Sequence, residues 1–316
     1  MYNTDLKERF IASVTDSENT ATLYRLIFRI SEPYEEHAGI DLCQMDERVG
    51  KPLANKLVGI SGTSVDKRLK LAKSYVKWCV ENGVPDAKLD FLNVSPNMYR
   101  NIERNMVSGP IMLEEYLGQV FDRPEEETVH NVYRCYLWLG FIGVPRHLLN
   151  ELSIWEVDLK QRVIETGDVR YAIIDEAMPV FRNCVDLIAF RSKQRYGTIL
   201  KTRSLGSYLL RGVADHFSLS HLAIKVTTLE ANAENDGKTE RRISYDRARL
   251  SGIFYRAFNA ELAGADAGFR TEAERLTDEE TEQREGTTEK WVQQRVSARE
   301  NSLRRDYERW KLTFFV

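Results

Sequence analysis

Three stretches of the sequence gather lysine and arginine side chains at spacings that suit contacts with phosphate groups. They cover residues 67–77, residues 191–212, which contain no acidic residue, and residues 241–249. Guanidinium and ammonium groups supply the point charges and hydrogen-bond donors that nucleic-acid backbones require. The side chains that we expect to contact DNA are Lys67, Arg68, Lys70, Lys73, Lys77, Lys193, Arg195, Lys201, Arg203, Arg241, Arg242 and Arg247.

The chain as a whole is not basic. It contains 45 Lys and Arg residues against 48 Asp and Glu residues, which gives a formal net charge of −3. Composition therefore does not force the three basic clusters, and a local DNA-binding surface is one interpretation of them. The alternative is that these lysines and arginines only keep helix surfaces soluble.

Metal, cofactor and membrane chemistry are not expected. The four cysteines are far apart, with no Cys-x-x-Cys pair and no Cys/His spacing typical of a metal site, which predicts buried free thiols in a reducing compartment. No stretch approaches the roughly 20 apolar residues of a membrane span, and the charged start MYNTDLKERF does not resemble a signal peptide. We therefore expect a cytoplasmic protein without a metal or small-molecule cofactor.

Periodicity predicts that the first 110 residues form a helical domain. The clearest helix follows Ser64, a good N-cap residue, and is stopped by Gly83 and Pro85. Lys70, Lys73 and Lys77 lie opposite its apolar side. That apolar stripe comprises Val65, Leu69, Ala72, Val76 and Val80.

Residues 111–316 predict a second, mostly helical domain with one small antiparallel sheet. An apolar helix is expected over residues 129–143, and alternation around the Thr-Gly-Asp turn at residues 166–168 predicts a hairpin within residues 160–174. Helix is expected again over residues 175–191, followed by a loop and another helix. A charged segment at residues 271–289 is expected to be a solvated helix or a mobile insertion.

The order of these elements resembles the tyrosine recombinase (phage integrase) family. The segment GFIGVPRHLLNELSIWEVDL, residues 140–159, follows the rhythm of that family's first signature: a helix-ending glycine, a Glu-Leu pair and an acidic residue where a strand begins. The resemblance implies a mainly α fold, with a helical SAM-like core-binding domain followed by an α+β integrase-like domain. It also implies Arg146, Arg249 and Tyr307 as the catalytic residues if the chain is active.

The sequence departs from that family's pattern at several catalytic positions. Pro145 stands in register with the first arginine, so that only its neighbour Arg146 could serve. Asp246 replaces the histidine of the second signature, and Leu250 stands where a second histidine is usual. An aspartate repels a phosphate instead of stabilising its transition state. These departures predict a catalytically degenerate protein.

Each candidate catalytic residue could instead have a purely structural role. Arg146 could solvate a turn, Arg249 could pair with an acid such as Asp246, and Tyr307 with Trp310 could be packing residues. The leading hypothesis is a duplex-DNA-binding protein of mobile-element or phage origin that does not cleave strands and that self-associates on DNA. The alternatives are a helical protein-interaction or regulatory protein, and a divergent active recombinase.

Overall fold

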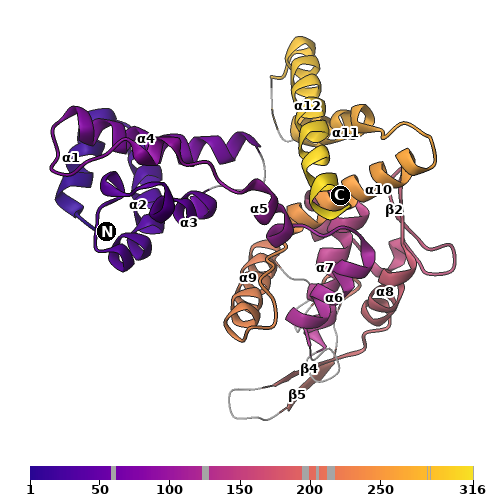
Figure 1. Cartoon of the computed structure of the whole chain (residues 1–316). Helices are drawn as coiled ribbons and strands as arrows, with labels where there is room; N and C mark the ends of the chain where they lie inside the picture. The colour runs from indigo at the N-terminus through magenta and orange to yellow at the C-terminus, as the bar shows by residue number, and fades with distance from the viewer. Residues whose placement is uncertain are drawn as a thin grey trace. The chain divides into compact units, whose positions relative to one another are not determined.

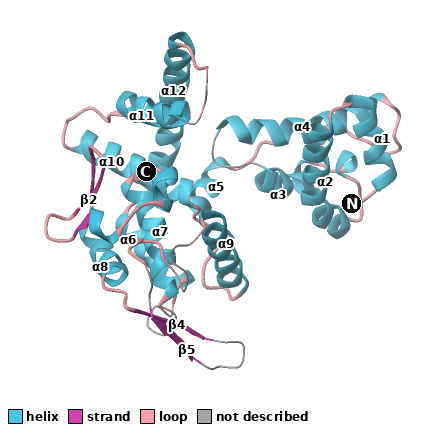
Figure 2. Ribbon diagram, turned by 180° about the vertical axis from the view of Figure 1, so that it is seen from behind, coloured by secondary structure: helices cyan, strands magenta, loops and turns pink. Residues whose placement is uncertain are grey.

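The structure is a computed structural model that describes residues 1–57, 62–122, 128–193, 199–203, 206–211, 218–282, 284 and 286–315 (Figure 1). It divides into two compact units, residues 1–102 and 103–316. The domain boundary near residue 110 stays a prediction. The fold is mainly helical, with an N-terminal helical unit and a small antiparallel sheet in the second unit, as the sequence predicted (Figure 2).

The first unit packs its helices around a cluster of aromatic rings. Phe10 and Phe28 each contact Tyr75 edge to face, with ring centroids 5.2 and 4.9 Å apart, a geometry that aromatic pairs favour. Its elements are α1 (Thr4–Val14), α2 (Glu18–Ala38), the 3₁₀ turn η1 (Leu42–Gln44), α3 (Glu47–Leu57), α4 (Gly62–Glu81) and η2 (Asp90–Asn93), and α5 (Met98–Asn105) follows them.

Helix α4 confirms the expected amphipathic pattern. Leu69, Ala72 and Val76 are buried, whereas Lys70 and Lys77 are exposed on the other side of the helix. The helix ends at Glu81, and Gly83 follows with φ +66°, a left-handed conformation that glycine adopts without steric cost. It begins at Gly62, earlier than the Ser64 cap predicted.

The second unit contains more elements than the first. Its helices and 3₁₀ turns are α6 (Pro110–Val120), α7 (Val129–Ile142), η3 (Arg146–Asn150), η4 (Ile154–Glu156), η5 (Asp175–Ala177), α8 (Met178–Val185), α9 (Leu219–Asn235), α10 (Tyr245–Leu262), α11 (Phe269–Glu282) and α12 (Glu289–Phe314). Its strands are β1 (Val157–Asp158), β2 (Val163–Thr166), β3 (Val169–Ala172), β4 (Ala189–Lys193) and β5 (Ile199–Arg203).

Strands β1, β2 and β3 form the three-stranded antiparallel sheet, in that order. The predicted hairpin is confirmed: Thr166 pairs with Val169, and Gly167 in the turn has φ +58°. Val157, Ile164 and Tyr171 lie opposite one another in the register and are all buried. One face of the sheet therefore packs on the core, as alternation requires.

One expectation for this unit was wrong, and another was right only in part. Residues 189–193 form strand β4 and pair with β5 in a separate hairpin, where we expected helix and loop; the hairpin projects away from the helices in Figures 1 and 2. The charged segment is helical up to Glu282, as one of the two alternatives predicted, but it is not fully solvated, because α11 buries Phe269, Ala273 and Thr277. The first segment is stabilised by pairing with β5, which follows a few residues later, and the second by packing on α12. Neither partner is visible in the helical periodicity of the segment itself.

Helix α7 is the centre of the second unit, and α10 crosses it closely. Nearly every residue from His130 to Ile142 is buried, which is typical of a helix surrounded by protein. Two glycines allow the close approach. A Cβ atom at Gly140 would lie 2.9 Å from the carbonyl oxygen of Tyr245, and one at Gly252 would overlap the carbonyl oxygen of Phe141. The two backbones thus meet where neither helix has a side chain.

Replacing Gly252 by alanine is expected to lower the free energy of unfolding by about 3 kcal/mol, because the added methyl group would force the two helix backbones apart. The measurement is urea denaturation followed by circular dichroism. Gly118→Ala in α6 is the matched control: no atom lies within 4 Å of a Cβ at this exposed position. It should raise stability by about 0.5–1 kcal/mol. Equal stability of the two variants would contradict the close crossing.

Candidate functional site

The site begins where α7 ends. Gly143 has φ +103°, and its amide donates to the carbonyl oxygens of Leu139 and Gly140, so that the chain leaves the helix there. Val144 is buried, and its carbonyl accepts a 2.5 Å hydrogen bond from the hydroxyl of Tyr245. Pro145 is extended (φ −63°, ψ 140°) and precedes the turn η3. Arg146, the first residue of η3, is therefore presented to solvent.

Arg146, Asp246 and Arg249 lie around two neighbouring tyrosines, Tyr136 and Tyr245, whose rings are tilted by 33° with centroids 4.8 Å apart. Burial raises the pKa of Tyr136 to about 12, while the charge of Arg146 acts to lower it and that of Asp246 to raise it. Burial likewise raises the pKa of Tyr245, against the opposing charge of Arg249. Each of these charges therefore acts on one or both of the tyrosines.

The guanidinium of Arg249 is held by a carboxylate. It donates to both oxygens of Glu279 on α11, one of them at 2.8 Å, and its side chain is only 12% exposed. This is the fork geometry by which arginine binds carboxylates and phosphates alike. A phosphate that approached Arg249 would have to displace Glu279. The sequence suggested pairing with an acid, but with Asp246 and not with this distant partner.

Tyr307 lies elsewhere. Its ring is fully buried against Phe254, Phe269 and Trp310, and its hydroxyl donates a 2.7 Å hydrogen bond to Glu261. Burial and this carboxylate raise the pKa of the hydroxyl. Glu261 follows Arg249 by twelve residues on α10, about 18 Å along the helix axis at 1.5 Å per residue. The structure therefore does not bring Tyr307 to the group formed by Arg146, Asp246 and Arg249.

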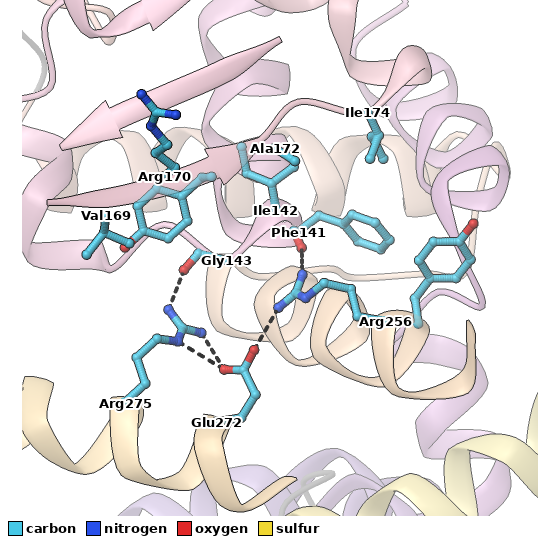
Figure 3. Close-up of a pocket in the computed structure, with 12 residues that line it drawn as sticks. Phe141, Ile142, Gly143, Val169, Arg170, Ala172, Ile174, Arg256, Glu272 and Arg275 are labelled. Atoms are coloured by element: carbon cyan, nitrogen blue, oxygen red, sulfur yellow. Dashed lines mark hydrogen bonds and ion pairs between the residues drawn. The ribbon is translucent and has the colours of Figure 1, made fainter. Parts of the chain in front are cut away.

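Helix α11 supplies residues of the candidate site that sequence reasoning missed. Glu272 bridges two guanidinium groups, those of Arg256 and Arg275, and each arginine also donates to a carbonyl of the α7 end: Arg256 to Phe141 and Arg275 to Gly143 (Figure 3). Glu272, Arg275 and Glu279 are spaced i, i+3 and i+7, so that they share one face of a helix. This spacing was the signal available in the sequence.

The predicted DNA-contacting residues differ in their exposure and in their partners. Arg68, Lys70 and Lys77 are exposed on α4, and Lys77 lies 3.6 Å from Glu81. The ammonium group of Lys73 donates to two carbonyls at the end of η2, those of Leu92 and Val94, at 2.7 and 3.0 Å. The side chains outside the described part of the structure are those of Lys67, Lys193, Arg195, Lys201 and Arg203.

The arginines of the third basic cluster are half-buried. Arg242 binds Glu234 on α9 through its Nε at 2.7 Å, and its backbone amide donates to the carbonyl of Arg104. Burial lowers the pKa of Arg247, which lies near the charges of Asp246 and Asp306. Arg241 is also half-buried. These three arginines are therefore partly enclosed by other groups of the protein. A role in DNA binding stays a prediction for them.

Neither a metal site nor a membrane-spanning helix is found among the described residues. Among those residues, no group of three or more His, Cys, Asp or Glu side chains could hold a metal ion. No described helix combines the length and the apolar character that crossing a bilayer demands.

A helical N-terminal unit followed by a mainly helical unit with a small sheet is the arrangement that the resemblance to tyrosine recombinases implies. Residues 1–81 match the family model described as MrpR, N-terminal core-binding domain. The match covers 81 of the 316 residues and confirms the core-binding domain that the sequence predicted.

Solved structures add a weaker likeness. The integrase of transposon Tn1549, solved in complex with transposon right end DNA, is 13% identical, and the match covers 80% of this chain and 86% of that one at a TM-score of 0.35. A TM-score this low does not establish a shared fold. No curated protein sequence matches the chain.

Proposed function

We propose that this protein binds duplex DNA through its core-binding domain and does not cleave the strands. The observation that carries DNA binding is the match of residues 1–81 to a core-binding domain, in which α4 exposes Arg68, Lys70 and Lys77 away from its buried stripe. Exposed cations can neutralise phosphates and release the counterions that surround DNA, which drives sequence-independent affinity.

Binding without cleavage follows from how the second unit uses its candidate groups. Arg249 is occupied by Glu279, an aspartate stands in the position of the expected histidine, and Tyr307 is buried on another part of the unit. Transition-state stabilisation needs cations and an acid at one phosphate together with the nucleophile. The proposal assigns the second unit to scaffold and contact roles.

Reversing two charges on α4 should weaken duplex binding at least about tenfold, because each lost phosphate contact also removes released counterions. The test is fluorescence anisotropy of a labelled 30-base-pair duplex at about 50 and 200 mM salt, comparing the parent with Lys70→Glu/Lys77→Glu. The slope of log affinity against log salt should fall by about 2. Unrelated duplex sequences should be affected alike, because phosphate contacts carry no base information.

The matched control is Arg29→Glu/Lys88→Glu, which changes the net charge of the first unit equally but at exposed positions outside α4. It should weaken binding much less. An equal loss in both double variants would attribute the effect to net charge and not to α4. Absence of salt-dependent binding in the parent would contradict the DNA-binding proposal and favour a protein partner.

A further inference from the structure

A cavity of about 310 Å³ lies between the end of α7, strand β3, α10 and α11, all within the second unit (Figure 3). This volume is at the lower end of the range for small-molecule sites, roughly 300–1,000 Å³. The proposed contact of α4 with DNA does not involve this cavity.

The walls of the cavity are largely apolar and aromatic. Phe141 and Tyr255 contribute rings whose centroids are 5.9 Å apart, and Tyr171 adds a third ring from β3. Ile142 and Ile174 complete this part of the lining. Such walls gain free energy by covering the flat, apolar body of a ligand.

Arginine side chains bring positive charge to the cavity. Arg256 and Arg275 line it and share Glu272, the one carboxylate of the lining among the described residues. Arg170 also belongs to the lining but pairs with Glu165, which lies outside it. Arg256 uses one nitrogen for the carbonyl of Phe141 at 3.1 Å and another for Glu272 at 3.2 Å, and its side chain is 42% exposed. Its remaining N–H groups can therefore donate to a bound anion.

A glycine makes room for these guanidinium groups. A Cβ atom at Gly143 would lie 3.2 Å from Nη2 of Arg256 and 3.7 Å from Nη2 of Arg275. Burial lowers the pKa of Arg256, which means that its cation is held at some cost and would gain from a further anionic partner. The cavity thus combines an apolar interior with the exposed guanidinium of Arg256, which shares its carboxylate partner Glu272 with Arg275.

We propose that this cavity is a binding site for a small organic anion with an aromatic body. The rings of Phe141, Tyr171 and Tyr255 would cover the body, and the acidic group would lie at Arg256. This inference goes beyond DNA binding and does not depend on it.

The test uses 1-anilinonaphthalene-8-sulfonate, an aromatic anion that fluoresces when it leaves water, with the full-length protein. The uncharged analogue N-phenyl-1-naphthylamine is the comparison probe, because it keeps the rings and lacks the sulfonate. The anion should bind saturably at one site and at least about tenfold more tightly than the neutral analogue, the range expected for a hydrogen bond to a charged group. Equal affinity for the two probes would overturn the proposal.

Two variants locate the binding. Ala172→Phe adds a ring at an exposed cavity position on β3, where strands accept aromatic residues, and should weaken binding at least about tenfold by filling the cavity. Arg256→Gln removes the cation at the rim and should weaken binding by up to about tenfold. Arg162→Gln is the matched control: this exposed arginine precedes the same hairpin, pairs with Asp175 and does not line the cavity.

Arg162→Gln should bind the anion as the parent does. Unchanged affinity in both Ala172→Phe and Arg256→Gln, with circular dichroism like that of the parent, would place the probe elsewhere and overturn the proposal. If Ala172→Phe failed to fold, Arg256→Gln measured against Arg162→Gln would still decide the question, since both replaced side chains are exposed.

Discussion

A nicked suicide DNA substrate is expected to give no covalent adduct with this protein. Strand transfer by a tyrosine needs the hydroxyl oxygen at the phosphorus atom, with cations and a general acid around it. The hydroxyl of Tyr307 instead donates to Glu261 inside an aromatic cluster, and its pKa is raised by burial and by that carboxylate. Both features oppose attack of this hydroxyl on a phosphate, which is why we expect no adduct.

The remaining groups make the expected loss of rate very large. Removal of one preorganised contact to a transition state typically costs about 10²- to 10³-fold, and removal of a general acid about 10²- to 10⁴-fold. Here Glu279 occupies Arg249, and Asp246 brings a negative charge beside it. Together these changes should lower the rate by at least about 10⁴-fold, even if Tyr307 could reach the DNA.

The measurement is a denaturing gel of labelled nicked duplex after incubation with the parent protein, with Tyr307→Phe and with Glu279→Gln. All three should show free DNA only. Glu279→Gln tests whether release of Arg249 alone restores cleavage, which the distance to Tyr307 argues against. An adduct in the parent that disappears in Tyr307→Phe would show an active recombinase, with α11 and α12 rearranged on DNA.

Residue periodicity and turn residues within short segments were enough to predict some elements of the fold. The α4 helix follows from its apolar stripe and from Gly83, and the β2–β3 hairpin follows from Gly167 between alternating residues. In both cases the information lies within a few residues of the element itself, in side-chain period and turn chemistry. The sequence therefore placed these two elements correctly.

The candidate site could be predicted only in part, because its decisive contacts are non-local. Glu279 follows Arg249 by 30 residues, so no helical spacing relates the two. The acids of α11 look solvated in the sequence, yet Glu272 and Glu279 bind arginines of α10. Tyr307 was the late tyrosine that the family pattern requires, and its burial depends on rings from three helices, which the sequence order does not bring together.

The ion pair between Lys7 and Glu35 should have the largest effect on the stability of the first unit. Both side chains are 0% exposed, and the ammonium group donates to both carboxylate oxygens at 2.6 Å. Glu35 also accepts from Ser31 and from the amide of Leu42, each at 2.8 Å. Lys7→Met should lower the free energy of unfolding by about 3–5 kcal/mol, because it leaves a buried carboxylate without its counter-ion.

The loss should depend on pH in a defined direction. Burial raises the pKa of Glu35, and the charge of Lys7 opposes that rise. Without Lys7 the folded-state pKa of Glu35 rises further above its unfolded value. The stability of Lys7→Met is therefore retained below the unfolded pKa, where Glu35 is neutral in both states, and is lost as pH rises through the folded pKa. The gap to the parent should widen from acidic to neutral pH.

The measurement is amide hydrogen exchange in the full chain, followed in peptides from residues 1–102 at several pH values after correction for intrinsic exchange rates. The double variant Lys7→Met/Glu35→Gln is the control, because glutamine can still accept from the amide of Leu42 and carries no charge. It should regain most of the protection and lose the pH dependence. Arg25→Met, which breaks an ion pair near the surface with Glu8, should change exchange little. A Lys7→Met variant as well protected at neutral pH as the parent would show that the pair adds nothing to stability and that the carboxylate can be buried alone.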